Sequence, residues 1–403
     1  MIDIEDVLAA RERVAETARQ TPLDYSHTFS AMTGADVHLK LETFQRTGSF
    51  KIRGATNKIA TLSEAEQDAG VVTASAGNHA QGVALAATRI GVDSTIVMPE
   101  HAPVSKVEAT RNYGAEVVLY GDDYDEAAER AHEIERAEDR VYVHAFDDEQ
   151  VMAGQGTIGL EILEELPDAE TVLVPIGGGG LIAGIATAVK AKNPDARIVG
   201  VQAEGASSVA DSLQKGEVVE RDSVDTIADG IATRKVGTKT FAVIQERVDE
   251  VVTVSDEETA VALTTLLERS KTLVEGAGAV ALAALLEGKF DYDDDETIVP
   301  CLCGGNIDMN VLTTVIMRGL VETGRFLRIR TVLKDRPGEL ERLVEVISDH
   351  QANIHAIEHD RAAKDMAMNA AEVELDLETK GPDHAEALLA DLRDHGYEVD
   401  VRT

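Results

Sequence analysis

One lysine stands in a setting that suits covalent chemistry. Lys51 follows the turn-forming residues Thr47, Gly48 and Ser49, and no carboxylate stands next to it in the sequence. An amine presented on a turn can attack a carbonyl group, as lysines do in several classes of enzyme. By itself, Lys51 would be interpreted as an ordinary solvated lysine. The chemical interpretation therefore depends on residues that lie much later in the chain.

Four consecutive glycines form the second feature. They follow a β-rich run at residues 171–176 and lead into a helical pattern that starts at Leu181. The four are Gly177, Gly178, Gly179 and Gly180. Adjacent glycines cost backbone entropy, so a turn with only a structural role would contain fewer of them. Backbone N–H groups without side chains at the start of a helix can hold a phosphate. A loose strand-to-helix turn is the structural alternative.

The same glycines permit a different interpretation. Gly178, Gly180 and Gly184 approach the glycine pattern of dinucleotide-binding sites, and Glu204 ends the next β-rich run, where an acid can bind a ribose. The spacing differs by one residue from that pattern, and the site lies in the middle of the chain. An NAD(P)-dependent dehydrogenase is therefore the alternative enzyme class.

A second strand-to-helix junction, Ser75-Ala76-Gly77-Asn78-His79, carries small and polar residues. The first N–H groups of a helix attract a carboxylate, and Asn78 offers an amide that can bind an oxygen atom. This junction is the candidate site for the carboxylate of a small substrate. Simple capping of the helix is the alternative.

The only cysteines, Cys301 and Cys303, lie at a third junction, which continues as Gly304-Gly305-Asn306. Two cysteines exclude an extensive disulfide framework and are too few for a zinc site made of cysteines. A Cys-x-Cys metal site would need further ligands, and none stands nearby in the sequence. Cys303 is interpreted as a small group that faces a pocket, and no metal is expected.

The lysine, the glycine loop and the carboxylate-binding junction together match one cofactor. Pyridoxal phosphate needs a lysine for its Schiff base, an anion site for its phosphate and a neighbouring site for the carboxylate of an amino acid. None of the three features is sufficient alone. Their combination predicts a pyridoxal-phosphate enzyme with a small amino-acid substrate.

Residues 1 to about 322 resemble the fold-type II pyridoxal-phosphate enzymes, and within them the threonine (serine) dehydratases, also called threonine ammonia-lyases. The resemblance rests on an ordered set of motifs: Thr21-Pro22-Leu23, Leu39-Lys40-Leu41-Glu42, residues 45–55 around Lys51, Ser75-Ala76-Gly77-Asn78-His79, the four glycines, Val274-Glu275-Gly276-Ala277-Gly278 and Cys303-Gly304-Gly305-Asn306. It implies conversion of L-threonine to 2-oxobutanoate and ammonia by β-elimination, with activity on L-serine as well.

The resemblance also implies a role for each motif. Lys51 would carry the cofactor and move the Cα proton, Phe50 would pack on the cofactor ring, and Asn78 would bond its 3′-hydroxyl. Glu275 is a further cofactor-binding candidate, and Cys303 would stand opposite the pyridine nitrogen, where a neutral group favours elimination. The N–H groups that would hold the phosphate belong to Gly177, Gly178, Gly179, Gly180 and Leu181. The substrate carboxylate would bind at Ser75, Ala76, Gly77, Asn78 and His79.

Two positions depart from the related serine racemases. Those enzymes carry a serine at the position of Ala76, and racemisation needs such a second acid on the opposite face of Cα. Their divalent-metal pattern begins at a residue like Glu204, but its later acidic position falls at Ala210, with Asp211 one step away. Both departures disfavour racemisation and a metal site, and a serine racemase or a serine-preferring dehydratase is kept as the alternative within this fold.

The charge balance excludes several partners. The chain has 74 Asp and Glu against 38 Lys and Arg, a formal net charge of −36. The acids are spread over helical polar faces, which indicates a strongly acidic solvated surface and resembles adaptation to high salt. Such a surface disfavours nucleic acid and anionic membranes as partners. With no basic, apolar leader at the start and no apolar run long enough to span a membrane, a cytoplasmic protein is expected.

Short β-rich runs alternate with helical stretches through most of the chain, as is typical of βαβ units. The runs lie at residues 37–42, 71–73, 94–98, 115–120, 140–146, 171–176, 197–202, 250–254 and 297–302. This alternation predicts an α/β protein with two parallel sheets. The resemblance makes them the two domains of a tryptophan-synthase-β-like fold, with the smaller one, at about 50–147, inserted in the larger.

After a boundary near residue 323 the pattern changes to β-α-β-β-α-β, which predicts a ferredoxin-like unit at 324–403. Residues 333–340 and Ala352-Asn353-Ile354 resemble an ACT regulatory domain. The resemblance implies an amino-acid effector, isoleucine or valine, and a homo-oligomer, a dimer or tetramer, in which two such domains meet. The effector residues would be Asp335, Gly338, Asn353 and Ile354. A dimerisation module without a ligand and a catalytically inert amino-acid sensor are the alternatives.

Overall fold

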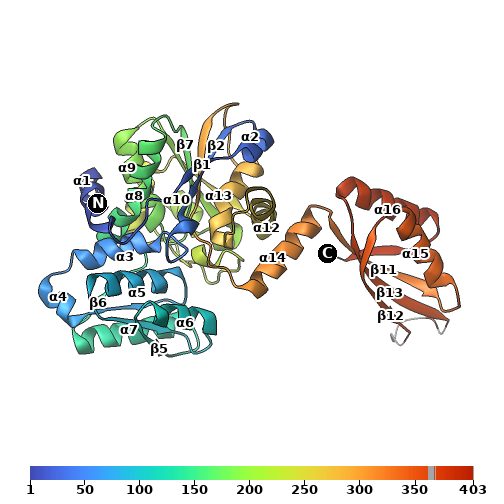
Figure 1. Ribbon diagram of the computed structural model, residues 1–403, viewed down its shortest axis with the longest axis horizontal. Helices are drawn as coiled ribbons and strands as arrows, with labels where there is room; N and C mark the ends of the chain where they lie inside the picture. The colour runs from blue at the N-terminus through green and yellow to red at the C-terminus, as the bar shows by residue number, and fades with distance from the viewer. Residues whose placement is uncertain (362–366, 368, 403) are drawn as a thin grey trace. The chain divides into compact units, whose positions relative to one another are not determined.

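The computed structural model describes residues 1–361, 367 and 369–402. It divides into two compact units, Met1–Asp308 and Met309–Thr403 (Figure 1). The sequence places the boundary near residue 323, but helix α14 (Met309–Glu322) belongs to the second unit, where it packs against strand β11 (Phe326–Lys334). No pattern in the sequence indicates that contact.

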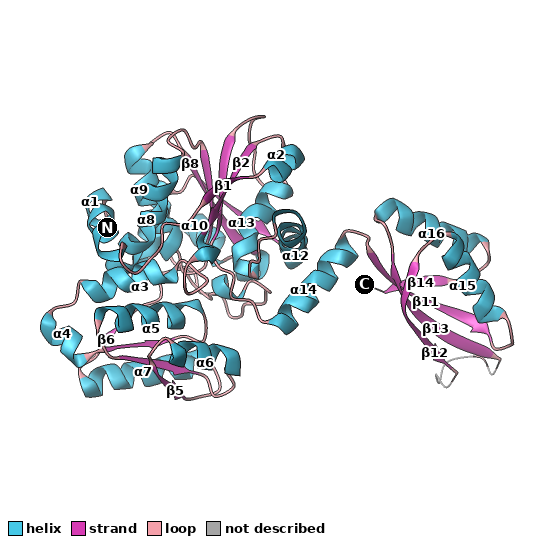
Figure 2. Cartoon of the chain, in the orientation of Figure 1, coloured by secondary structure: helices cyan, strands magenta, loops and turns pink. Residues whose placement is uncertain are grey.

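The larger sheet of the first unit is parallel except at one edge, where β1 runs antiparallel to β2. Its strand order is β1 (Leu23–Tyr25), β2 (Asp36–Leu41), β10 (Thr297–Leu302), β7 (Thr171–Pro175), β8 (Arg197–Ala203) and β9 (Glu250–Val254). The helices of this part are α1 (Ile4–Val14), α2 (His27–Thr33), α8 (Glu149–Glu165), α9 (Gly180–Lys192), α10 (Ser208–Lys215), α11 (Thr238–Arg247), α12 (Asp256–Thr265) and α13 (Gly276–Leu286) (Figure 2). The central strands are apolar and buried, as expected for a parallel sheet covered on both faces.

The smaller sheet of the first unit is parallel throughout. Its order is β5 (Glu116–Leu119), β4 (Ser94–Met98), β3 (Val71–Ala74) and β6 (Val141–Tyr142), with helices α3 (Lys51–Ala60), α4 (Glu64–Ala69), α5 (Asn78–Ile90), α6 (Val104–Asn112) and α7 (Tyr124–Glu138). The prediction of two parallel sheets is confirmed. The expected strand at 140–146 is shorter than predicted, because His144 Nδ1 accepts the N–H groups of Phe146 and Asp147 and turns the chain out of the sheet.

Helices α3, α8 and α9 pack through glycines. A Cβ added at Gly54 on α3 would lie 2.8 Å from the carbonyl oxygen of Val151 on α8. A Cβ added at Gly184 on α9 would lie 2.3 Å from the carbonyl oxygen of Met152 on α8. Since a real Cβ does not approach backbone so closely, these helices can pack at this distance only with glycine at both positions. Gly184 therefore serves helix packing.

Buried charges join the same region. Arg53 on α3 is 1% exposed; its Nη2 lies 2.7 Å from Glu42 Oε1, and its Nη1 lies 2.6 Å from Glu161 Oε1 on α8. Lys40 Nζ on β2 donates to Glu161 Oε2 at 2.7 Å. Burial alone would raise the pKa of Glu42, but the charge of Arg53 and its hydrogen bonds outweigh burial and lower that pKa. Two cations and two carboxylates thus neutralise one another in the core.

The second unit contains an antiparallel sheet with the order β12 (Asn353–Asp360), β13 (Ala370–Glu378), β11 and β14 (Val399–Arg402). Helices α15 (Glu339–Asp349) and α16 (Pro382–Asp394) contribute Leu343 and Leu388 to its apolar core. The chain order β11-α15-β12-β13-α16-β14 matches the predicted β-α-β-β-α-β succession. None of the helices in the described parts of the chain has the length and apolar character needed to cross a membrane.

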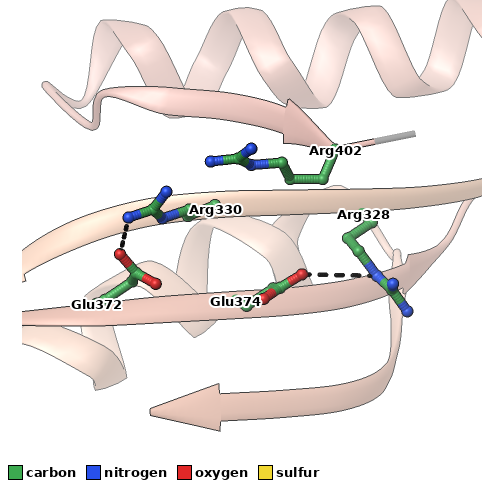
Figure 3. A pocket seen from close by; sticks show the side chains of 5 residues that line it. All are labelled: Arg328, Arg330, Glu372, Glu374 and Arg402. Carbon is green, nitrogen blue, oxygen red and sulfur yellow. Dashed lines mark hydrogen bonds and ion pairs between the residues drawn. The ribbon is translucent and has the colours of Figure 1, made fainter. Parts of the chain in front are cut away.

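Charged pairs cross the strands of this sheet at a shallow pocket (Figure 3). Arg330 on β11 pairs with Glu372 on β13, and Arg328 lies 3.8 Å from Glu374 and 2.5 Å from Asp376. The arginines are more than a third exposed, so water screens these pairs and each adds little stability.

We expect the buried charge cluster to matter more to stability than exposed ion pairs do. Arg53→Met leaves Glu42 and part of Glu161 buried without a cation, which costs about 3–5 kcal/mol. Its free energy of unfolding should be measured by denaturant titration beside Arg11→Met. Arg11 forms an exposed pair with Glu164, a kind of pair worth about 0–1 kcal/mol. Equal losses in the two variants would show that the cluster does not hold the unit together.

Candidate active site

A cavity of about 720 Å³ lies where strands of both sheets of the first unit end. Ala74 ends β3, Pro175 ends β7, and Cys303 follows β10, and all three line the cavity. Ligands of parallel α/β sheets bind at this edge, outside the carboxyl ends of the strands. The predicted site residues that line the cavity are Phe50, Lys51, Ser75, Gly77, Asn78, His79, Gly177, Gly178, Gly179, Gly180, Leu181, Glu275 and Cys303.

Ala76 is the one predicted residue of the carboxylate junction that does not line the cavity. Its side chain packs against the apolar cluster of the smaller sheet. The junction alternates in direction, so that Ser75 and Gly77 face the cavity and Ala76 between them faces the core.

Lys51 is the first residue of α3, and its Nζ donates to the carbonyl oxygen of Ala145 at 2.9 Å. The same nitrogen lies 5.2 Å from the centre of the Phe50 ring. Burial lowers the pKa of Lys51 to about 8, and the charge of Glu275 only partly opposes this shift. About half of this amine is therefore neutral and nucleophilic near pH 8, where an ordinary lysine is almost fully protonated.

The turn before Lys51 is held by the loop that follows β10. Ser49 and Gly304 form an isolated β-bridge, and the N–H of Phe50 donates to the carbonyl oxygen of Cys303 at 3.1 Å. Gly48 has a positive φ of 72°, and a Cβ there would lie 2.4 Å from Asn306 Oδ1. Only glycine satisfies both conditions, so the lysine and the third junction form one structural element.

The four glycines connect β7 to α9 and are required by close contacts. A Cβ added at Gly178 would lie 2.3 Å from the ring of Phe146, and one at Gly177 would lie 2.9 Å from Ile231 Cα. Gly179 has a φ of 92°. The carbonyl oxygen of Gly178 accepts from Thr240 Oγ1 at 2.7 Å. Because the peptide is planar and trans, the N–H of Gly179 points away from Thr240. Side chains at Gly177 and Gly178 would collide with Ile231 and Phe146, so the loop forms a cradle of backbone without side chains.

The start of α5 carries a neutral histidine. His79 is buried, and its Nε2 donates to the carbonyl oxygen of Val143 at 2.9 Å. Burial and the nearby charge of Lys51 lower the pKa of His79 to about 3, so this imidazole is uncharged at physiological pH. Ser75 Oγ accepts the N–H of Gly77 at 3.1 Å. The junction therefore offers hydrogen-bond donors and no full positive charge.

Asn78 lies between two other polar side chains. Its Nδ2 donates to Glu275 Oε1 at 2.6 Å, and its Oδ1 accepts from Asn306 Nδ2 at 2.8 Å. Burial raises the pKa of Glu275 to about 7. Glu275 precedes α13, and its side chain accepts no hydrogen bond from the first turn of that helix, so the carboxylate serves the cavity rather than the helix.

Cys303 is buried, and its thiol donates to the carbonyl oxygen of Cys301 at 3.3 Å. Burial raises the pKa of Cys303 well above its usual range, so this residue presents a neutral group. Among the described residues, no group of three or more His, Cys, Asp or Glu is arranged to hold a metal ion.

The structure does not support a dinucleotide-binding site at the glycine loop. Glu204, which would have bound the ribose, is exposed after β8 and lies outside the lining of the cavity. Gly184 lies inside α9, where it packs against α8.

Some lining residues were missed by sequence reasoning. Ala145 and Phe146 come from the end of the predicted strand at 140–146. They line the cavity because the chain turns out of the sheet before it reaches them. Asp229 begins a short 3-10 helix, Asp229–Ile231, and Arg234 lies in the loop after it, and no motif in this stretch indicates a site. Arg234 Nη1 lies 3.4 Å from Asp125 Oδ2, so the ion pair joins the larger and the smaller parts of the first unit.

The four predicted effector residues are not brought together within one chain. Lys334 pairs with Ala370 at one end of β13, and Asn353 pairs with Glu378 at the other end. Eight steps along a strand span roughly 27 Å. Asp335 and Gly338 therefore lie at one end of the sheet, and Asn353 and Ile354 lie at the other.

Known proteins are similar to this chain in sequence and in fold. The profile of the pyridoxal-phosphate dependent enzyme family matches residues 14–304. The L-threonine ammonia-lyase of Thermotoga maritima is 47% identical over 401 residues, 100% of both chains, and that of Geobacter sulfurreducens is 50% identical over 392 residues, 97% of both chains. The structure of maize serine racemase matches with a TM-score of 0.75 and 37% identity, covering 79% of this chain and 98% of that one.

The cavity fits the cofactor of this family. A partly neutral amine at Lys51, a side-chain-free cradle at the four glycines and the flat ring of Phe50 are the groups that pyridoxal phosphate requires. The predictions of an enzyme and of this cofactor are confirmed. The chain belongs to the family of pyridoxal-phosphate-dependent enzymes.

Proposed function

We propose that this enzyme is an L-threonine ammonia-lyase, which converts L-threonine to 2-oxobutanoate and ammonia and also accepts L-serine. The observation that carries the proposal is Lys51, a half-buried amine of lowered pKa between the glycine cradle and the start of α5. Two relatives that match 97–100% of the chain carry the name L-threonine ammonia-lyase, which supports the choice of substrate. A strongly acidic surface further suggests that the enzyme works at high salt.

Pyridoxal phosphate supplies an electron sink for the negative charge that develops at Cα when the proton leaves. Lys51 would hold the cofactor through Nζ until the amine of the substrate displaces it there, and the freed Nζ would then take the Cα proton. The β-hydroxyl leaves as water after protonation, and either Lys51 or the cofactor phosphate supplies that proton. The remaining enamine gains water and loses ammonia, so the water lost in elimination is balanced by the water gained in hydrolysis.

The other residues of the cavity position the reactants. The N-terminal turn of α5, with Ser75, Gly77 and Asn78, would bind the substrate carboxylate, because helix N-termini attract anions. The N–H groups of the four glycines and Leu181 would bind the phosphate. Cys303, as a neutral thiol, would leave the pyridine nitrogen without an acid partner, a condition that suits elimination.

Serine racemase is the second candidate, because the maize enzyme of that name resembles this chain closely. Racemisation needs an acid on the face of Cα opposite Lys51. Ala76 has no ionisable group and lies outside the cavity lining. Chiral analysis of the products from L-serine separates the candidates: D-serine would indicate the racemase, and pyruvate with ammonia the lyase.

Lys51→Ala should abolish deamination of threonine and serine and remove the visible absorbance of the bound cofactor, because no other amine takes its place in the proposed mechanism. Lys58→Ala is the matched control, since Lys58 lies on the same helix and pairs with Asp148. Activity should be measured as oxo-acid formation at high salt. Steady-state deamination by Lys51→Ala would refute the assignment.

Cofactor attachment should accelerate with pH. Only the neutral Lys51 amine binds a carbonyl group, and its pKa is lowered to about 8. The rate should therefore be low at pH 6, rise through pH 8 and level off above it. Reconstitution of the cofactor-free enzyme, followed by absorbance, measures this rate. A rise centred near pH 10 instead would mean that Lys51 is solvated like an ordinary lysine.

We also propose that the second unit binds isoleucine or valine and regulates the enzyme as an ACT domain. The two pairs of effector residues lie at opposite ends of one sheet, so a complete site would need a second chain. This supports a homo-oligomer, a dimer or tetramer, as the active form.

Isoleucine or valine should then change the rate of threonine deamination by the full-length enzyme, and Gly338→Val should remove the effect. Gly338 has a φ of 90°, which a β-branched residue adopts only with strain. Basal activity and calorimetric binding should be measured for both forms. If neither amino acid binds or alters the rate, the unit serves assembly alone.

A further inference from the structure

Three polar side chains form a chain of hydrogen bonds beside the cavity. Asn306 Nδ2 donates to the carbonyl oxygen of Thr47 at 2.6 Å and to Asn78 Oδ1 at 2.8 Å. Asn78 Nδ2 then donates to Glu275 Oε1 at 2.6 Å. We call Thr47, Asn306, Asn78 and Glu275 the amide relay.

Both ends of the amide relay fix its direction. The carbonyl oxygen of Thr47 can only accept, so the atom of Asn306 that faces it must be the amide nitrogen. The two hydrogens of that nitrogen serve Thr47 and Asn78, which makes the oxygen of Asn78 the acceptor. The nitrogen of Asn78 therefore faces Glu275, whose ionised carboxylate can only accept.

The position of Glu275 is built into the backbone around it. A Cβ added at Gly304 would lie 2.2 Å from Glu275 Oε1, and one added at Gly230 would lie 3.0 Å from the same atom. Two glycines thus make the space that this carboxylate occupies. A half-buried carboxylate in such a slot needs a strong donor, and Asn78 supplies it.

We propose that Glu275 is a positioning residue that fixes the direction of the Asn78 amide, so that Asn78 presents only an N–H donor to the bound cofactor. One N–H of Asn78 is taken by Glu275, and the other is left for the cavity that Asn78 lines. A donor there stabilises a negatively charged ring oxygen and cannot accept from a neutral hydroxyl. The inference deepens the proposed function, on which it rests for the reaction that this oxygen serves.

The charge of Glu275 makes the relay sensitive to pH. The charged or titratable groups that face it are Lys51, Lys106, Asp229 and Cys303. Burial, aided by Asp229, outweighs the hydrogen bond from Asn78 and the charges of the two lysines, and it raises the pKa of Glu275 to about 7. The acceptor is therefore ionised above pH 7. As the pH falls through 7, the carboxylate gains a proton on one oxygen and loses its charge, so its other oxygen accepts the N–H of Asn78 more weakly.

Two substitutions of Glu275 separate its charge from its hydrogen bond, and Glu287→Gln is the control. Glu287 is an exposed residue that follows the same helix, α13. Glu275→Gln keeps an acceptor, so cofactor affinity should stay within about threefold of the wild type. The pH midpoint of the cofactor absorbance should fall by about one unit, because a nearby negative charge that favours the protonated form is lost. Glu275→Leu removes the acceptor and should weaken cofactor binding about tenfold or more.

Asn306→Asp tests the direction of the relay without changing Glu275. Aspartate cannot donate to Thr47 or Asn78, so cofactor affinity should fall about tenfold even though Glu275 is intact. Wild-type affinity and an unchanged absorbance titration in Glu275→Leu or Asn306→Asp would overturn the proposal. If circular dichroism shows that Glu275→Leu does not fold, the other two variants decide.

These readouts do not depend on threonine. An enzyme that binds the cofactor with the expected titrations but does not deaminate threonine would contradict the proposed function and leave the relay intact. An Asn306→Asp enzyme with wild-type cofactor affinity and normal deamination of threonine would contradict the relay and leave the proposed function intact.

Discussion

The neutralisation of buried charges around Arg53 is the constraint on which the rest of the first unit depends. Arg53 binds Glu42 beside β2 and Glu161 on α8, so one guanidinium ties the start of α3 to both. Residues two apart on a helix point in nearly opposite directions, about 200° apart. With Arg53 directed into the core, Lys51 is directed into the cavity. Lys51, the residue proposed to perform the chemistry, is thus positioned by Arg53, which has no proposed role in it.

Burial also sets the electrostatics of the cavity. Lys51 and Glu275 have pKa values shifted toward each other, to about 8 and about 7, because each loses water that would stabilise its charge. His79, deeper in the same wall, stays neutral. The cavity therefore contains an amine that loses its proton readily and a carboxylate that gains one readily. A site of this kind can move a proton at Cα without large changes in solvation.

Glycine has two separate uses around the site. At Gly48 and Gly179 the backbone adopts a positive φ. At Gly177 and Gly178 neighbouring residues approach so closely that no side chain fits, and at Gly82 an added Cβ would lie 3.0 Å from the carbonyl carbon of Lys51. Because all of these glycines are needed for contacts with distant parts of the chain, loop and helix glycines alike belong to the functional architecture.

The sequence by itself determined the alternation of strands and helices, and it singled out Lys51 and the glycine loop as candidate site residues. These are local signals, because period, turn residues and helix starts are written within a few positions. Only the tertiary structure decided that Ala76 turns away from the cavity, that Phe146 closes the cradle and that Glu275 meets Asn78, residues that are 197 positions apart in the chain. Tertiary structure also separated Asp335 from Asn353, whose positions depend on strand register. Contacts across sheets depend on which faces can be buried together, and no stretch of sequence contains that information alone.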